Sequence, residues 1–378
     1  MMTTRHRACC AVEALEDRNL MAVAVQLVDR GSTLRLTGDT AAEWISIHQD
    51  DALNTLSVQW GIINPAVDAV PPPVQQFTSS TIKRIVVNTR GGNDTVTYAV
   101  DGLNYSFAKS INIDTGAGND TVMIDMGGQL YVPLSIDGGD SVDGMMPEPP
   151  YNWPTPTPLE IQTNLNVSVQ AGAGNDSVDA IFGHVLKGLS YRAVGGTGND
   201  SLSTSLAGVV SAGRTVIISQ DGGVGNDHLA FNQDANSIEA GARLSVVQRG
   251  GAGNDQIDLQ SFGLIQGTLL VNQVGNTGND KLSTIVNASW PSTGVVRVRA
   301  QGETSNDQMV VGIKRNTDIP PFVVMEGPLA EMRVEASAHG GMGRNLAWVT
   351  PNVKVYNATV MESSWNVGSI LPVDPWPF

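Results

Sequence analysis

Cysteine, aromatic side chains and positive charge are all scarce in this sequence. The only two cysteines, Cys9 and Cys10, are adjacent and near the N-terminus, so the rest of the chain can form neither a disulfide framework nor a cysteine-ligated zinc site. Aromatic residues make up only 5% of the 378 residues, too few for a wide globular core. With a net charge of −15, the chain is poorly suited to nucleic acid or an anionic membrane, because neutralising phosphates requires clustered cations. We therefore expect a long, thin core and cations as partners.

Long apolar runs and helical periodicity are also missing. No stretch reaches the roughly 18 apolar residues that a transmembrane helix needs, so we expect no membrane span. The apolar segment that follows Arg5-His6-Arg7 is too short for an ordinary secretory signal. Beyond about residue 25 there is almost no helical pattern, so strands cannot be joined by crossover helices as in a doubly wound sheet.

Glycine, by contrast, is abundant, with 41 residues, and much of it belongs to a repeated G-x-G-N-D motif. From Asp94 to Asp307 the spacing of the final aspartates is mostly 24 to 28 residues, with two outlying steps of 20 and 36 that sum to two periods. A fixed period indicates a repeat architecture instead of two or three globular domains. The aspartates of all complete and degenerate copies are Asp94, Asp120, Asp140, Asp176, Asp200, Asp227, Asp255, Asp280 and Asp307.

Each copy of the motif lies between two segments of alternating apolar and polar residues. Residues 110–114, S-I-N-I-D, precede one copy, and residues 121–125, T-V-M-I-D, follow it. Alternation with period two predicts strands that bury one face. Stacking such units satisfies the backbone and buries the Val, Ile and Leu faces. The sequence therefore predicts an all-β, right-handed parallel β-helix of about ten coils, each of roughly 26 residues.

We expect one β-helix over residues 24–378, preceded by an N-terminal segment over 1–23. Clustered prolines predict loops at 64–80 and 143–158, because proline removes the donors of a central strand. The segment Ala42-Glu43-Trp44-Ile45 is interpreted as a degenerate first copy of the turn. Residues from 346 to the C-terminus are expected to supply final strands and a cap against end-to-end pairing.

The N-terminal segment carries a second recognisable pattern. Residues 12–22, V-E-A-L-E-D-R-N-L-M-A, resemble the LEPR-XLL leader found near the start of many large secreted bacterial surface proteins. Asp17 stands where that motif has proline, and Met21 where it has its second leucine. The resemblance implies export and an extracellular or cell-surface location. The alternative is an amphipathic N-terminal helix that caps the stack.

The repeated turn itself resembles the hemolysin-type (RTX-like) calcium-binding repeat, G-G-x-G-x-D followed by a strand triplet whose second residue is apolar. Residues 250–258, G-G-A-G-N-D-Q-I-D, match all nine positions. The resemblance implies that calcium binds between stacked coils at the nine aspartates given above. That family repeats the motif twice per coil, whereas this chain has one copy per coil, which implies a single ladder of sites. A metal-free Gly-Asn-Asp turn ladder remains the alternative.

These patterns favour a non-enzymatic, secreted or cell-surface structural or adhesive solenoid. Its partners would be calcium ions and an extracellular or cell-envelope polysaccharide or protein. The five histidines are scattered, and the chain has no H-E-x-x-H, G-x-S-x-G or phosphate-binding loop. A carbohydrate-active β-helix enzyme is the alternative from a different class. It would have to use a pair such as Asp137 with Asp140, or Lys187 with Arg192.

Overall fold

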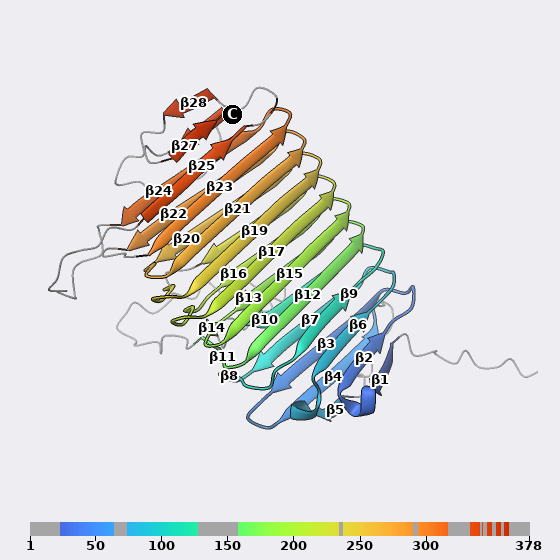
Figure 1. The fold of residues 1–378 in the computed structure, drawn as a ribbon. Coiled ribbons are helices and arrows are strands. Elements are labelled where there is room, and N and C mark those ends of the chain that lie inside the picture. Colours follow the sequence, from blue (N-terminus) through green and yellow to red (C-terminus); the bar gives the residue numbers. More distant parts are fainter. Residues whose placement is uncertain are drawn as a thin grey trace, which may run out of the picture.

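The computed structural model describes residues 23–63, 74–127, 158–233, 237–289, 294–316 and 333–340, Met342, and the short segments 346–349, 353–356 and 359–362. Within these residues the chain is all-β, has no α-helix and forms a parallel β-solenoid (Figure 1). The expected fold class is therefore confirmed. Strands run across the axis and stack along it, so one core extends through the described coils.

Two long sheets enclose the core, and each regular coil gives one strand to each of them. Sheet A contains twelve strands in the order β1 (Ala24–Val28), β2 (Thr33–Thr37), β6 (Arg84–Asn88), β9 (Ser110–Asp114), β12 (Asn164–Ala173), β15 (Gly188–Thr197), β17 (Thr215–Val224), β19 (Arg243–Ala252), β21 (Thr268–Thr277), β23 (Val295–Thr304), β25 (Arg333–His339) and β27 (Val353–Tyr356). In the regular coils, the G-x-G-N-D turn carries the chain from a sheet A strand into a sheet B strand.

Sheet B contains thirteen strands, and a third, small sheet closes part of the coil. The order in sheet B is β28 (Thr359–Glu362), β26 (Leu346–Val349), β24 (Gln308–Asn316), β22 (Lys281–Ser289), β20 (Gln256–Gly263), β18 (His228–Gln233), β16 (Ser201–Leu206), β13 (Ser177–Phe182), β10 (Thr121–Met126), β7 (Thr95–Asp101), β3 (Glu43–Asp50), β4 (Thr55–Ile62) and β5 (Gln75–Thr78). The small sheet joins β14 (His184–Val185), β11 (Glu160–Ile161) and β8 (Asn104–Tyr105).

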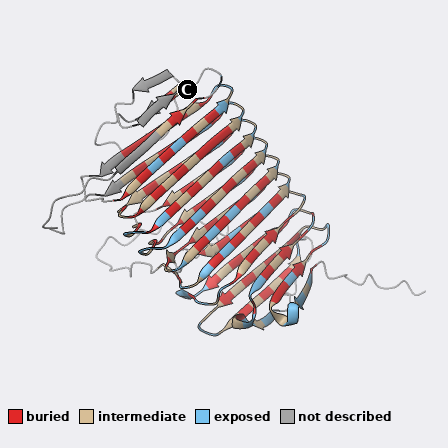
Figure 2. Cartoon of the chain, viewed as in Figure 1, coloured by how far each residue is buried: buried red, intermediate tan, exposed pale blue. Residues whose placement is uncertain are grey.

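The alternating sequence sets which side chains enter the core. In β12 and β15 the residues at every second position are buried, and the residues between them face outward (Figure 2). Parallel pairing is in register from coil to coil, for example Val167 with Tyr191 and Tyr191 with Ile218. Buried rows are consequently continuous along the axis, and burial of this apolar surface is the main favourable term for folding. Phe182 and Tyr191 add an edge-to-face contact with ring centroids 5.2 Å apart.

The solenoid makes about seven turns, fewer than the roughly ten expected. The coils from β6 to β24 share the same plan of a sheet A strand, the motif turn and a sheet B strand. The ten coils expected from the sequence also included the segments at the two ends of the stack. At the N-terminal end the stack finishes differently, since β1 pairs antiparallel with β2, and β4 pairs antiparallel with β3 and β5.

The expected loop at 64–80 is only partly a loop. Gln75–Thr78 form the edge strand β5, and Ser79–Thr81 form a short 3-10 turn, η2, while residues 64–73 lie outside the described part of the chain. All but Val23 of the N-terminal segment 1–23 and all but Pro158 of the second predicted loop also lie outside it. None of the described residues forms a helix with the length and hydropathy of a membrane-spanning segment.

Candidate functional site in the repeated turn

Backbone geometry explains the glycines of the turn. Gly198 has φ +128°, and a Cβ placed on it would lie 1.8 Å from the carbonyl oxygen of Gly174 in the neighbouring coil. Both the positive φ and the close stacking therefore require glycine. Where the first glycine of the motif is lost, Asn276 and Glu303 adopt φ of 75° and 74°. The degenerate copies thus keep the backbone path of the complete ones.

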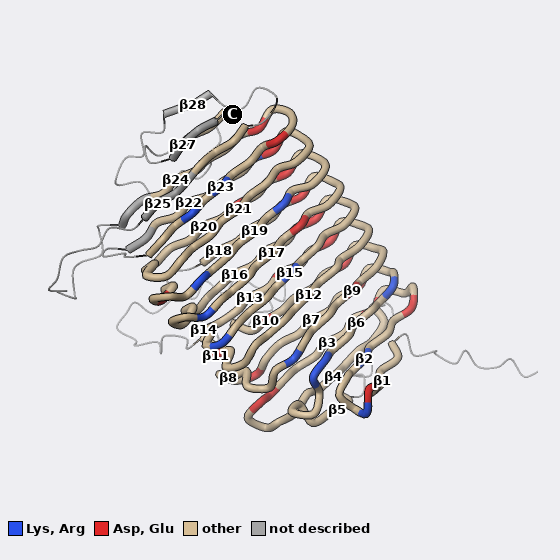
Figure 3. Tube along the Cα trace, in the orientation of Figure 1, with Lys and Arg blue, Asp and Glu red and all other residues tan. Residues whose placement is uncertain are grey.

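The aspartates that end the motif form one buried column along the solenoid. We call this set the Asp column, and each member is between 0% and 3% exposed: Asp94, Asp120, Asp176, Asp200, Asp227, Asp255, Asp280 and Asp307. Figure 3 shows acidic residues gathered along the edge at which the sheet A strands end. Eight of the nine aspartates expected from the sequence are therefore brought together. Asp140 lies outside the described residues.

One carboxylate oxygen of each aspartate in the column is used to cap the backbone of the coil before it. The N–H of Asp176 donates to Oδ1 of Asp200 at 2.9 Å, and the N–H of Asp200 donates to Oδ1 of Asp227 at 2.8 Å. The same bond links every successive pair from Asp94 to Asp307. A buried N–H left without an acceptor costs about 1 to 3 kcal/mol, so the carboxylates have a structural role at each coil.

Glu43 extends the column to the first coil. Its N–H donates to Oδ1 of Asp94 at 2.8 Å, as an aspartate of the motif would do. Its longer side chain turns back, and its Oε1 accepts the N–H of Asp39 at 2.9 Å. The segment 42–45 therefore occupies the place of a degenerate first copy, as the sequence indicated.

The second oxygen of these carboxylates is the unusual feature of the site. In the Asp column, Oδ2 is buried and has no hydrogen-bond partner at Asp176, Asp200, Asp227, Asp255 and Asp280, whereas the hydroxyls of Thr89 and Thr115 lie beside the carboxylates of Asp94 and Asp120. At Gly195 a Cβ would lie 2.3 Å from Oδ2 of Asp200, so the glycine that opens the six-residue G-G-x-G-N-D form leaves room for the carboxylate. Oδ2 of Asp227 lies equally close to a Cβ built on Gly222, at 2.4 Å. The corner thus contains a line of acceptor atoms without donors.

Burial makes the charged form of these carboxylates unfavourable. Loss of solvent raises the pKa of Asp176, Asp255 and Asp280 to about 6 and that of Asp227 to about 7, against the lowering effect of the backbone N–H bonds. Neighbouring aspartates raise these pKa values further, since like charges one coil apart repel. For Glu43 burial has the same effect and raises the pKa to about 7. The column therefore favours either protons or cations near neutral pH.

The asparagine that precedes each aspartate forms a second ladder, bonded in the opposite sense. The N–H of Asn199 donates to Oδ1 of Asn175 at 2.7 Å, and the N–H of Asn226 donates to Oδ1 of Asn199 at 2.7 Å. Asparagine side chains thus accept from the following coil, whereas aspartate side chains accept from the preceding coil. Each coil boundary between Asn93 and Asn306 is closed by two reciprocal bonds, which explains why the motif contains both residue types.

The donor set of the column fits a hard cation in kind, because carboxylate and carbonyl oxygens are the ligands that calcium prefers. The unpartnered, buried Oδ2 atoms are the atoms that such an ion would need. Calcium takes six to eight oxygens, however, and no three His, Cys, Asp or Glu side chains converge on one point in the part of the chain that the structure describes. Each ion would therefore depend on two carboxylates of adjacent coils together with main-chain oxygens or water.

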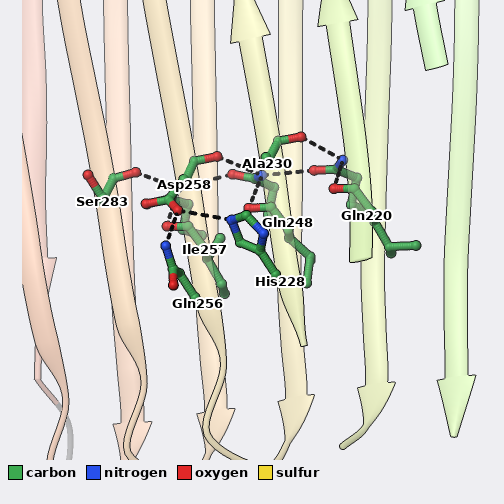
Figure 4. Close-up of polar contacts among 11 residues, drawn as sticks. Gln220, His228, Ala230, Gln248, Gln256, Ile257, Asp258 and Ser283 are labelled. Atoms are coloured by element: carbon green, nitrogen blue, oxygen red, sulfur yellow. Dashed lines mark hydrogen bonds and ion pairs between the residues drawn. The ribbon is translucent and has the colours of Figure 1, made fainter. Parts of the chain in front are cut away.

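A third stack, which the sequence reasoning missed, lies inside the core. In this Gln ladder, made of Gln220, Gln248 and Gln273, the Nε2 of Gln248 donates to Oε1 of Gln220 at 2.8 Å. Nε2 of Gln273 donates in the same way to Oε1 of Gln248 at 3.0 Å. Nε2 atoms of the ladder also reach sheet B carbonyls, such as those of Ala230 and Asp258 (Figure 4). Each glutamine stands seven residues before an aspartate of the column, a spacing that could have revealed it.

The other chemically active side chains are dispersed. His228 pairs with Asp258 at 3.2 Å, and His48 pairs with Asp101 at 3.5 Å, both on the outer side of sheet B but on separate coils. Lys187 is exposed in the turn before β15, and the side chain of Arg192 is exposed on that strand. Asp137, like Asp140, lies outside the described residues.

The chain matches no protein-family model, no curated protein and no solved structure.

Proposed function

We propose that this chain is a secreted or cell-surface structural rod, without catalytic activity, whose Asp column binds calcium. The observation that carries the proposal is the line of buried Oδ2 atoms that lack hydrogen-bond donors. A bound cation would neutralise adjacent carboxylates and supply the missing partner of each oxygen. The rod would present its two broad faces to cell-envelope or extracellular polysaccharide or protein.

Two features support a role outside the cell. The N-terminal segment resembles a leader of secreted surface proteins, and millimolar calcium is characteristic of extracellular fluids, where modules with dissociation constants of about 10⁻⁴ to 10⁻³ M are occupied. At a calcium concentration equal to its dissociation constant, each site adds about 0.4 kcal/mol to the free energy of unfolding. Roughly seven such sites would add ~3 kcal/mol, a sizeable share of the stability of an ordinary domain.

The test is thermal unfolding of the full chain at pH 7.5, followed by far-UV circular dichroism, in EDTA and in millimolar calcium. We expect calcium to raise the melting temperature by about 5 to 10 °C. Magnesium chloride at the same ionic strength should have a much smaller effect, because magnesium needs a stricter octahedral shell and gives up its waters reluctantly. Equal melting temperatures in EDTA and calcium would overturn the calcium part of the proposal in favour of the metal-free ladder.

A matched pair of variants separates the Asp column from general charge effects. Asp200→Asn with Asp255→Asn keeps the Oδ1 acceptors and removes two negative charges from the column, so the calcium response should fall. Asp179→Asn removes a carboxylate from the outer side of sheet B, where Asp179 is only partly buried, and should leave the response unchanged. The absence of catalytic activity is tested separately, by incubating the chain with polysaccharides and measuring their cleavage. Cleavage that a single Asp→Asn change abolishes would contradict the non-enzymatic role.

A further inference from the structure

The two broad faces of the solenoid carry opposite charge. On the outward positions of sheet A, the described charged side chains are seven arginines, two aspartates and one glutamate: Arg35, Arg84, Arg192, Arg243, Arg249, Arg297, Arg299, Asp114, Asp221 and Glu303. All seven arginines are exposed, because they alternate with buried apolar residues along their strands. We call these outward positions the sheet A face.

The outward positions of sheet B have the reverse balance. Among the described side chains there, five are aspartates and one is lysine: Asp50, Asp101, Asp125, Asp179, Asp258 and Lys281. These aspartates are all at least partly exposed, unlike the buried Asp column at the corner. We call these outward positions the sheet B face.

This separation is unexpected in a chain with a net charge of −15, in which cations are the minority. Were they dispersed at random, arginines would occur as often on sheet B as on sheet A. Instead, seven of the ten described charged side chains on the sheet A face are arginines, whereas five of the six on the sheet B face are aspartates. Arginine on an exposed strand presents five donors in a planar fork, which suits bidentate bonding to carboxylates.

We propose that a second copy of this chain docks its sheet B face on the sheet A face, so that rods associate side by side. Both complementary surfaces are present on one molecule, and each is spread over several coils because each regular coil gives one strand to each sheet. The contact is heterologous: the surface used on one copy differs from the surface used on the next. In such an assembly the first and last copies each keep one face unpaired, one basic and one acidic. Further copies can therefore be added, which gives open stacks. Charge complementarity across the interface would set which faces meet.

Charge-driven contact of exposed faces is screened by salt, because the Debye length falls from roughly 20 Å at about 20 mM salt to roughly 4 Å at about 500 mM. The experiment is sedimentation velocity and static light scattering of the full chain in EDTA at these two salt concentrations. EDTA makes the result independent of calcium at the Asp column. We expect the average mass to rise at least two-fold at low salt and to return to that of the single chain at high salt.

Two face-reversed variants and their mixture give the decisive comparison. Arg192→Glu with Arg243→Glu and Arg299→Glu makes both faces acidic, whereas Asp125→Arg with Asp179→Arg and Asp258→Arg makes both basic. Each variant alone should remain a single chain at low salt, and an equal mixture of the two should associate again. The control, Arg30→Glu with Arg90→Glu and Lys187→Glu, makes the same charge change in exposed turns. It should still associate.

Circular dichroism of each variant establishes that it is folded before its mass is compared. The proposal is overturned if the natural chain stays single at low salt at about 100 µM, or if the face-reversed variants associate as well as it does. Poly-L-glutamate is added as a probe in a parallel series. If the natural chain stays single but binds poly-L-glutamate through the sheet A arginines, that face would be assigned to a foreign polyanion and self-association would be rejected.

Discussion

The Asp column and the Gln ladder both run from coil to coil, yet they leave their polar atoms in different states. In the ladder, Nε2 of each later glutamine donates to Oε1 of the glutamine before it, and the last acceptor, Oε1 of Gln273, receives the hydroxyl of Thr284 at 2.6 Å. In the column, one oxygen of each carboxylate accepts a backbone N–H, and the other has no donor at Asp176, Asp200, Asp227, Asp255 and Asp280. The first stack is closed and the second is open.

The difference follows from the side chains themselves. An amide has donors and acceptors, so identical amides stacked in register can satisfy one another. An ionised carboxylate only accepts, so identical carboxylates stacked in register can never do so. A stack of glutamines is therefore complete with the protein alone, whereas a stack of aspartates needs protons, cations or other donors. We infer that the ladder holds the two sheets together and that the corner is the part of the solenoid that responds to its surroundings.

The largest effect is expected when the corner is broken sterically. Gly225 has φ +146°, and a Cβ there would lie 1.7 Å from the carbonyl oxygen of Gly198. Gly225→Ala should therefore lower the free energy of unfolding by about 3 kcal/mol or more, measured by urea denaturation. Gly213 is the matched control, with φ +68° and no atom within 4 Å of its Cβ position, and Gly213→Ala should cost only about 1 kcal/mol. Equal losses would show that close stacking does not constrain the turn.

An intermediate effect is expected when the Gln ladder is interrupted. Gln248→Leu keeps a side chain of similar size but leaves Oε1 of Gln220 without its donor from the next coil. The free energy of unfolding should fall by about 1 to 3 kcal/mol, the cost of an unsatisfied buried polar group. Changing all three glutamines to leucine should cost less than three times as much, because the partners within the ladder are then removed together. A loss below about 0.5 kcal/mol for the single change would show that the ladder does not support the core.

The repeat, the strands and the Asp column were accessible from the sequence because one motif encodes all three. Regular spacing fixes the register of the stack, and register alone places Asp176, Asp200 and Asp227 in line. Backbone geometry in the degenerate copies was not accessible. The left-handed conformations of Asn276 and Glu303 are imposed by the coils on which they stack, not by their own preference.

Which polar side chains point into the core and which point outward was harder to predict from the sequence. Gln220 and Gln248 look like surface residues by composition, and only their constant distance from the turn, seven residues, indicates a shared inner row. The edge strand Gln75–Thr78 follows a run of prolines, and nothing local distinguishes it from the rest of that loop. The opposite charges of the two faces depend on which strand belongs to which sheet. That assignment can be made from the sequence only when the path of each coil is known.

The smallest expected effect is the response of the corner to protons. Burial raises the pKa of Asp227 to about 7, above the ordinary value near 4, so between these values the folded chain binds more protons than the unfolded chain. Stability should therefore fall as pH rises from about 4 to 7 and level off above that, and Glu43, with its pKa raised to about 7, acts in the same direction. In EDTA we expect the melting temperature to be higher at pH 5 than at pH 8. Asp227→Asn should weaken the slope between about pH 6 and 7. A melting temperature that is constant or rises over this range would mean that the carboxylates of the column are stabilised as anions, and the contrast with the closed Gln ladder would be lost.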